Sequence, residues 1–169
     1  MASLDSSTPL KRIGTTALAV ADGTTPSANS ISVIFEGSIS FTVSGRSVIE
    51  AMSQGRHKGT PVVVETQDQV TTVEFDGYIT SFKGSSNVHI YEALTRTGTA
   101  STWKTTSDGD GYCVKLTVTY LESKATSPST QEVVFAFAHP DSVQIEAGTE
   151  DAVRFTASFT NYENYPTVT

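Results

Sequence analysis

Residues 31–43 alternate apolar and polar side chains, and this stretch constrains the fold more than any other. One face carries the apolar side chains Ile31, Val33, Phe35, Ile39, Phe41 and Val43. The other carries Ser32, Glu36, Ser38, Ser40 and Thr42, with Ile34 as its one apolar residue. Because successive side chains of a strand point to opposite faces, the pattern predicts one long strand with a core face and a water face. Gly37 interrupts the apolar face and predicts a bulge or bend. A strand about twice the usual length is expected to meet something large, most simply another copy of the chain.

The overall composition indicates one folded domain. The 169 residues are enough to bury an ordinary core, and 37% hydrophobic with 17% charged residues is typical of neither a disordered nor a membrane-spanning chain. The net charge of -7 disfavours tight binding to a nucleic acid backbone, because such affinity comes from Lys and Arg. A protein with this charge could still lie close to DNA without binding to it.

Cysteine content and apolar runs predict the compartment. The single cysteine, Cys113, excludes an internal disulfide framework. No apolar run approaches the length of a transmembrane helix, and residues 17–21 are too short and too late for a signal peptide. We expect a self-assembling product made in the cytoplasm, without a membrane anchor.

Further alternating stretches predict a mainly β fold. Strands are expected over residues 17–21, 61–66, 70–82, 112–120, 133–137, 143–145 and 153–159. His139-Pro140-Asp141 is expected to turn the chain between two of them. Seven or eight strands with frequent turns predict an antiparallel β-sandwich or barrel with one flanking α-helix.

Two stretches have helical features. Residues 88–94 carry an apolar stripe, Ser86 or Asn87 can cap it, and Gly98 can stop it. Residues 47–54 have capping-box spacing and can form a short helix or an ordered loop.

No pattern indicates catalysis, a cofactor or a metal, so we expect a protein that is not an enzyme. The three histidines are isolated in sequence, and Asp108-Gly109-Asp110-Gly111 fits a hairpin turn better than a calcium loop. Glu74 and Asp76 share a strand face but have no partner typical of a glycosidase. Cys113 is expected to be a packing residue.

The order of these elements resembles the tail tube proteins (major tail proteins) of long-tailed bacteriophages. A strand at residues 73–79 precedes the helix at 88–94 and a turn with Trp103, and the strands of residues 112–159 follow. Upstream, the long strand and the excursion of residues 45–61 look like the inner sheet and intersubunit loop of that family.

The resemblance implies a structural virion protein. Its subunits would form hexameric rings that stack into a tube, with their long strands joined into one barrel around a lumen. DNA would pass through on ejection without specific binding. Other tail proteins, such as the tape measure and the terminator, would be partners, and the location would be the virion tail after synthesis in the host bacterial cytoplasm.

The resemblance also suggests roles for particular segments. Three acidic residues on polar strand faces are hypothesised to line the lumen: Glu36, Glu74 and Asp76. The N-terminal arm (residues 1–14), the 45–61 loop and the C-terminal tail (residues 161–169) are assigned to contacts between subunits or rings. The residues proposed for those contacts are Arg46, Arg56, His57, Lys58, Tyr162 and Tyr165.

Two alternatives belong to other classes. A capsid decoration (cement) protein would also be a small acidic β domain, but it would cap a shell. A soluble β-sandwich binding module would present an exposed aromatic platform, for which Trp103, Tyr162 and Tyr165 are the candidates.

Overall fold

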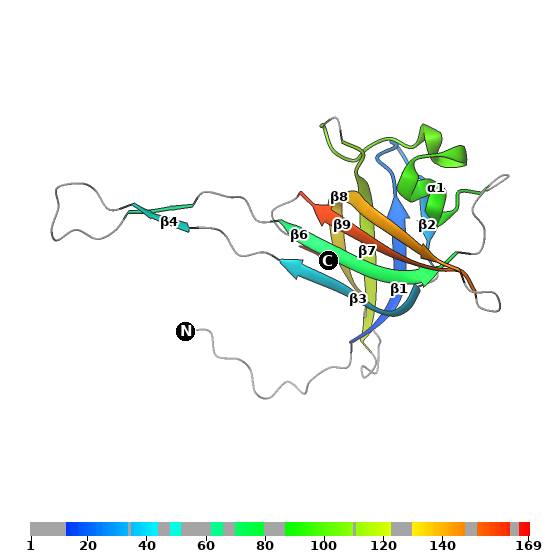
Figure 1. The fold of residues 1–169 in the computed structure, drawn as a ribbon, viewed down its shortest axis with the longest axis horizontal. Coiled ribbons are helices and arrows are strands. Elements are labelled where there is room, and N and C mark those ends of the chain that lie inside the picture. The colour runs from blue at the N-terminus through cyan, green and yellow to red at the C-terminus, as the bar shows by residue number, and fades with distance from the viewer. Residues whose placement is uncertain are drawn as a thin grey trace.

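The described part of the chain consists mainly of antiparallel β-strands with one short α-helix, which confirms the predicted mainly β fold with one helix. The computed structural model describes residues 13–33, 35–43, 48–51, 62–65, 70–79, 87–109, 111–122, 130–147, 152–162 and 166–169. The main sheet comprises β1 (Ile13–Ala21), β2 (Ser30–Ser32), β3 (Phe35–Val43), β6 (Thr71–Tyr78), β7 (Val114–Glu122), β8 (Thr130–Glu146), β9 (Arg154–Asn161) and β10 (Thr167–Val168). A helix, α1 (Ile90–Thr95), and a 3-10 helix, η1 (Gly98–Thr102), lie at one end of this sheet (Figure 1).

The sheet has the order β2-β1-β7-β8-β9-β6-β3 and is folded over at β8. The first half of β8 pairs with β7 as far as Ala138, and the second half pairs with β9 from Ala138 onward. One long strand therefore belongs to two layers: β2-β1-β7-β8 and β8-β9-β6-β3. Figure 1 shows these layers crossing each other. Short β10 extends the first layer by pairing with Val133 and Val134 of β8.

The predicted long strand of residues 31–43 is wrong as a single element. Its start is β2, which pairs with β1, and its end is β3, which pairs with β6 at the opposite end of the strand order. The alternation persists through the break because the chain passes from one layer to the other around the same core. The predicted irregularity at Gly37 is confirmed, since the β3–β6 register shifts between Glu36 and Ser40.

The core lies between the two layers and is built by the predicted alternation. β7 contributes Val114, Leu116 and Val118, and β9 contributes Phe155, Ala157 and Phe159, all essentially inaccessible to solvent. The ring of Phe75 stacks on that of Phe159 with centroids 5.5 Å apart. Burial of these side chains is the main source of stability, at about 1.5–3 kcal/mol for each large apolar side chain.

A second, two-stranded sheet continues the β3–β6 pair away from the sandwich. It consists of β4 (Val48–Ala51) and β5 (Val62–Glu65), and it lies beyond the ends of β3 and β6 (Figure 1). Val43 pairs with Thr71 and Val48 with Glu65, so the two ladders are successive parts of one long hairpin. The helix or ordered loop expected at residues 47–54 is wrong for 48–51, where cross-strand pairing overrides local propensity. Residues 44–47 and 52–61 lie outside the described part.

The expected turn at His139-Pro140-Asp141 is also wrong, because these residues lie inside the 17-residue strand β8. Proline lacks an N–H, but β7 no longer pairs with β8 beyond Ala138, so no bond on that side is lost. The β8–β9 register shifts between Pro140 and Ser142, which marks a bulge at Asp141. The turn-forming residues therefore interrupt the strand locally, but as a bulge and not as a turn.

The predicted helix is present but short, with six residues in α1. His89, and not Ser86 or Asn87, occupies the N-cap position. The buried carboxylate of Glu92 accepts hydrogen bonds from the hydroxyl and backbone N–H of Thr99, at 2.6 and 3.3 Å, which joins α1 to η1. Arg96 closes the helix in the left-handed conformation.

A buried aspartate fixes the loop between β1 and β2. The Asp22 carboxylate accepts hydrogen bonds from the backbone N–H of Asn29 at 2.7 Å, from Thr24, and from the N–H of Lys104 at 3.3 Å. Burial alone would raise the pKa of Asp22, but the hydrogen bonds from Thr24 and Asn29 together hold this pKa below its ordinary value of 3.8. This one side chain therefore joins the β1–β2 loop to the segment that follows η1.

Replacing Asp22 with Asn should lower the free energy of unfolding by about 1–3 kcal/mol at pH 7, because several donors lose a charged acceptor. The folded-state pKa is depressed, so the contribution of Asp22 is complete above pH 3.8 and is lost as the pH falls through the folded value. The difference between wild type and variant in urea denaturation should therefore shrink at pH 3. Asp108→Asn, at an exposed carboxylate, is the control. An equal loss at both pH values would contradict this role.

Replacing Gly98 with Ala should destabilise the fold by about 1–2 kcal/mol. Gly98 has φ of +55°, and a Cβ there would overlap the carboxylate of Glu92 that joins α1 to η1. Gly111→Ala is the matched control, because nothing lies within 4 Å of a Cβ added at that position. Thermal unfolding should show a lower Tm for the Gly98 variant alone, and equal Tm values for the two variants would refute the explanation.

Candidate assembly face and pocket

The layer β8-β9-β6-β3 presents a polar outer face. Its exposed side chains are Ser40 and Thr42 of β3, Thr72, Glu74 and Asp76 of β6, Arg154 and Thr156 of β9, and Ser142, Gln144 and Glu146 of β8. Strand register places them in rows: Glu74 lies between Ser40 and Ser158, and Asp76 pairs with Thr156. Two of the three predicted lumen-lining residues, Glu74 and Asp76, are therefore exposed on one face. Glu36 pairs with Asp76 through the backbone of β3.

Hydrogen bonds between neighbouring strands hold this polar face in place. The hydroxyl of Thr156 donates to Asp76 at 2.7 Å, and that of Thr160 donates to Asp141 at 2.6 Å. The hydroxyls of Ser142 and Ser158 lie 2.8 Å apart. The result is an acidic surface rich in hydroxyl groups, and its charge disfavours adhesion of an anionic polymer.

The same layer ends in two strand edges that have no partner strand among the described residues. β3 pairs only with β6, and β8 beyond Ala138 pairs only with β9. Unpaired edges of this length are templates for pairing with another chain. The single-chain sheet can therefore be extended at both ends by further copies.

Apolar side chains are exposed along one of these edges. Phe41 and Val43 of β3 are 40% and 39% exposed, although they were predicted on the core face. Phe41 contacts Phe135 of β8 edge to face, with ring centroids 5.5 Å apart, so only part of it reaches the core. These two residues lie at the end of the strand order, where a neighbouring copy could cover them.

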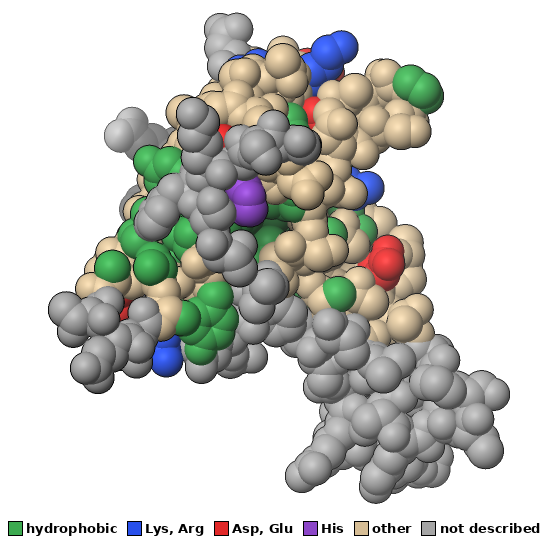
Figure 2. Space-filling view, turned by 90° about the vertical axis from the view of Figure 1, so that its right-hand side faces the viewer, with side chains coloured by type: hydrophobic (Ala, Val, Ile, Leu, Met, Phe, Trp, Pro, Cys, Tyr) green, Lys and Arg blue, Asp and Glu red, His purple; other side chains and the backbone are tan. Residues whose placement is uncertain are grey.

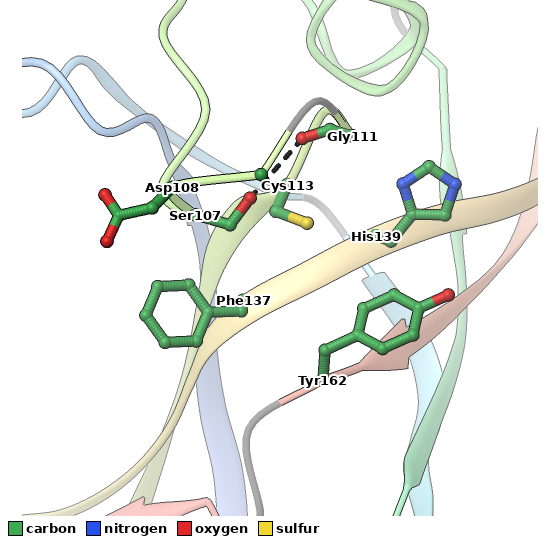
Figure 3. A pocket seen from close by; sticks show the side chains of 8 residues that line it. Ser107, Asp108, Gly111, Cys113, Phe137, His139 and Tyr162 are labelled. Carbon is green, nitrogen blue, oxygen red and sulfur yellow. Dashed lines mark hydrogen bonds between the residues drawn. The ribbon is translucent and has the colours of Figure 1, made fainter.

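A pocket of about 590 Å³ opens where β8 passes from one layer to the other. Its lining residues are Ser107, Asp108, Gly109, Gly111, Cys113, Phe137, His139 and Tyr162. Figure 3 shows where the lining side chains come from: Phe137 and His139 stand on β8, Tyr162 lies just beyond β9, and Ser107 and Asp108 belong to the loop before β7. Sequence reasoning missed this pocket, because a register shift between β7 and β8 turns Phe137 out of the core.

The loop above the pocket is fixed by hydrogen bonds to β7. Thr105 accepts from the backbone N–H of Cys113 at 3.0 Å and donates to the carbonyl of Gly111 at 2.9 Å. Cys113 itself is buried, in keeping with the packing role predicted for it. The expected hairpin turn at residues 108–111 is wrong, since η1 and not a strand precedes this loop.

The other wall of the pocket is equally ordered. The His139 Nδ1 lies 2.9 Å from the carbonyl oxygen of Tyr112, and the backbone N–H of Tyr162 donates to the Phe137 carbonyl at 3.2 Å. The Tyr112 hydroxyl donates to Ala93 of α1 at 2.8 Å. Burial raises the pKa of Tyr112 despite the nearby Arg96 guanidinium, so this hydroxyl stays a donor.

One of the residues predicted for contacts between subunits or rings is described. Tyr162 is 62% exposed at the rim of the pocket, and its role in contacts stays a prediction. Arg46, Arg56, His57, Lys58 and Tyr165 lie outside the described residues. Trp103 is 2% exposed and belongs to the core, so the aromatic platform expected of a binding module is wrong for this residue.

Charged side chains are few on one face of the described molecule. On the face drawn in Figure 2, hydrophobic side chains gather toward the lower left, and red and blue side chains are scattered. Within the described ranges, no three His, Cys, Asp or Glu side chains are grouped as a metal site would need. The described helices are too short to cross a membrane.

Comparison with known proteins shows a shared fold. No protein-family profile and no curated protein matches the sequence. Among solved structures, a chain of the anti-feeding prophage (AFP) baseplate, determined with six-fold symmetry, superposes with a TM-score of 0.51. Sequence identity is 11%, over 90% of this chain and 91% of that one. The SPP1 tail tube protein gives a TM-score of 0.44 at 12% identity, over 89% and 76% of the two chains.

Proposed function

We propose that this chain is a structural protein of a phage-tail-type assembly, and that it forms stacked hexameric rings of a tail tube through which DNA is ejected. The observation that carries the proposal is the layer β8-β9-β6-β3, which has a polar acidic face and two open edges. Copies joined edge to edge would extend this layer into a closed barrel. Closure pairs every strand edge. A closed ring therefore has no open edge at which further chains could aggregate.

The fold comparison supports an assembly of this kind. The AFP baseplate chain belongs to an assembly determined with six-fold symmetry, and it shares the fold over nearly the whole length of both chains. Six copies in a ring are the corresponding arrangement for this chain. The proposed location is the virion tail, with other tail proteins such as a tape measure and a terminator as partners.

The charge of the face suits a DNA channel. Among the described side chains of this face, Glu74, Asp76, Asp141 and Glu146 are acidic and Arg154 is basic. In a barrel with this face inward, the acidic groups would repel phosphate, so DNA could slide without lodging. The role is mechanical, and the chain needs no catalytic residue for it.

The first prediction is the assembly itself. Purified protein, concentrated and examined by negative-stain electron microscopy, should show six-fold rings or hollow tubes, and native mass spectrometry should show a hexamer. The physical reason is that burying the open edges and their apolar side chains favours closure. A protein that remains monomeric at every concentration, or that instead coats empty capsids as a decoration protein would, contradicts the tube.

The second prediction concerns the β3 edge. Val43→Lys should raise the concentration needed for assembly about tenfold or more, because burying one valine contributes about 1.5–3 kcal/mol. Ala17→Lys is the control, since Ala17 is also an exposed apolar residue but lies on β1, outside the segments assigned to contacts. Sedimentation velocity measures assembly, and thermal unfolding checks that both variants fold. Equal effects of the two substitutions would remove β3 from the interface.

A further inference from the structure

A bulge in β8 turns a large aromatic side chain out of the core and into the pocket. Regular alternation would place Phe137 on the same face as Phe135, which is completely buried. The β7–β8 register shifts here, so Ala138 is buried and Phe137 lines the pocket, where it is partly exposed. Burial of a phenylalanine stabilises a fold, and a ring held out of the core loses part of that contribution. Bulges that redirect a side chain in this way are common beside functional sites.

Two more aromatic rings line the same pocket. Tyr162 is 62% exposed at the rim, and its ring centroid lies 6.3 Å from that of His139, with the two rings inclined at 53°. The contact of His139 Nδ1 with the carbonyl oxygen of Tyr112, at 2.9 Å, fixes the imidazole ring. In the view of Figure 3, the rings of Phe137 and Tyr162 stand on opposite sides of Cys113. The described lining thus contains three aromatic rings.

The charge of the lining favours a cationic ligand. Asp108 contributes an exposed carboxylate, and the described lining contains no Lys or Arg. The faces of aromatic rings carry negative partial charge, so they attract cations as the carboxylate does. An anionic ligand would meet no compensating positive side chain among these residues. An organic cation is therefore the ligand class that the rings and the carboxylate both attract.

Backbone acceptors of the lining are already engaged. The Gly111 carbonyl accepts a hydrogen bond from the Thr105 hydroxyl at 2.9 Å, and the Phe137 carbonyl accepts one from the backbone N–H of Tyr162 at 3.2 Å. A primary ammonium group carries three N–H donors, and each needs an acceptor when it leaves water. A quaternary ammonium group has no N–H, and its methyl groups can pack against aromatic rings. This lining therefore suits a methylated ammonium better than a free amine.

We propose that the pocket lined by Asp108, Phe137 and Tyr162 binds a small organic cation with a quaternary ammonium group. The volume of about 590 Å³ is in the range of small-molecule sites, so it can hold the cationic head together with an attached chain. Hydrogen bonds of Thr105 and His139 fix the walls in advance, which reduces the entropy lost on binding. The inference goes beyond the proposed function and does not rest on it, because the described lining belongs to a single chain.

The test compares choline with two matched compounds. Neohexyl alcohol has the shape of choline with a carbon atom in place of the charged nitrogen, and ethanolamine has an unmethylated ammonium. Full-length ¹⁵N-labelled protein is titrated with each at constant ionic strength and about pH 8, where free imidazole is neutral. With choline, the amide signals of Gly109, Gly111 and Tyr162 should shift and saturate with a Kd on the order of 1 mM. Both other compounds should bind about fivefold or more weakly.

Substitutions within the pocket assign the binding to the ring and the carboxylate. Tyr162→Leu should weaken choline binding about fivefold, whereas Tyr162→Phe, which keeps the ring, should bind as the wild type does. Asp108→Asn should weaken binding about threefold, and Asp108→Glu should restore most of the loss. Thermal unfolding of each variant verifies that the fold is intact.

Each other outcome overturns a defined part of the inference. Equal binding of choline and neohexyl alcohol would overturn the attraction to a cation, and equal binding of ethanolamine would overturn the preference for a methylated group. Equal losses in Tyr162→Leu and Tyr162→Phe would remove the ring from the site. The absence of saturable shifts at the pocket with choline up to about 50 mM would overturn the site itself. If choline binds but the protein forms neither rings nor tubes, the proposed function fails and the binding site stands.

Discussion

Two stretches of chain, β8 and residues 30–43, hydrogen-bond to different neighbours along their two halves, and the architecture depends on this. β8 pairs first with β7 and then with β9, while β2 and β3 join opposite ends of the strand order. The sheet therefore cannot lie flat, because the connection between β2 and β3 brings its ends together around the core. The polar outer face and the two open edges are consequences of that folding.

Buried polar groups place the loops around this frame. Asp22 ties the β1–β2 loop to the segment after η1, and Glu92 ties α1 to η1. Thr105 then holds the following loop over Cys113. Because each group makes several hydrogen bonds, the loops are held in fixed positions against β7 and β8. The pocket exists because the 107–111 loop is held above the point where β8 changes partners.

The polar face with its open edges and the pocket lie on different parts of the molecule. The face and the edges belong to the layer β8-β9-β6-β3, and the pocket opens where β8 passes from one layer to the other. Among the described residues, the edges of β3 and of the second half of β8 leave backbone groups available for pairing.

The sequence alone determined the β class, most strand positions, the single helix and the polar faces, because period-2 alternation reports directly which side chains meet the core. It could not show that residues 31–43 split between two layers, since an alternating pattern looks the same on either side of the break. Trp103 likewise has no periodic context that would place it in the core.

Tertiary structure decided the rest. Cross-strand pairing turned residues 48–51 into a strand, a bulge absorbed the expected turn at Pro140, and a register shift brought Phe137 beside the 107–111 loop. These outcomes depend on which strands become neighbours, a choice made by long-range packing and not written in any local stretch of sequence.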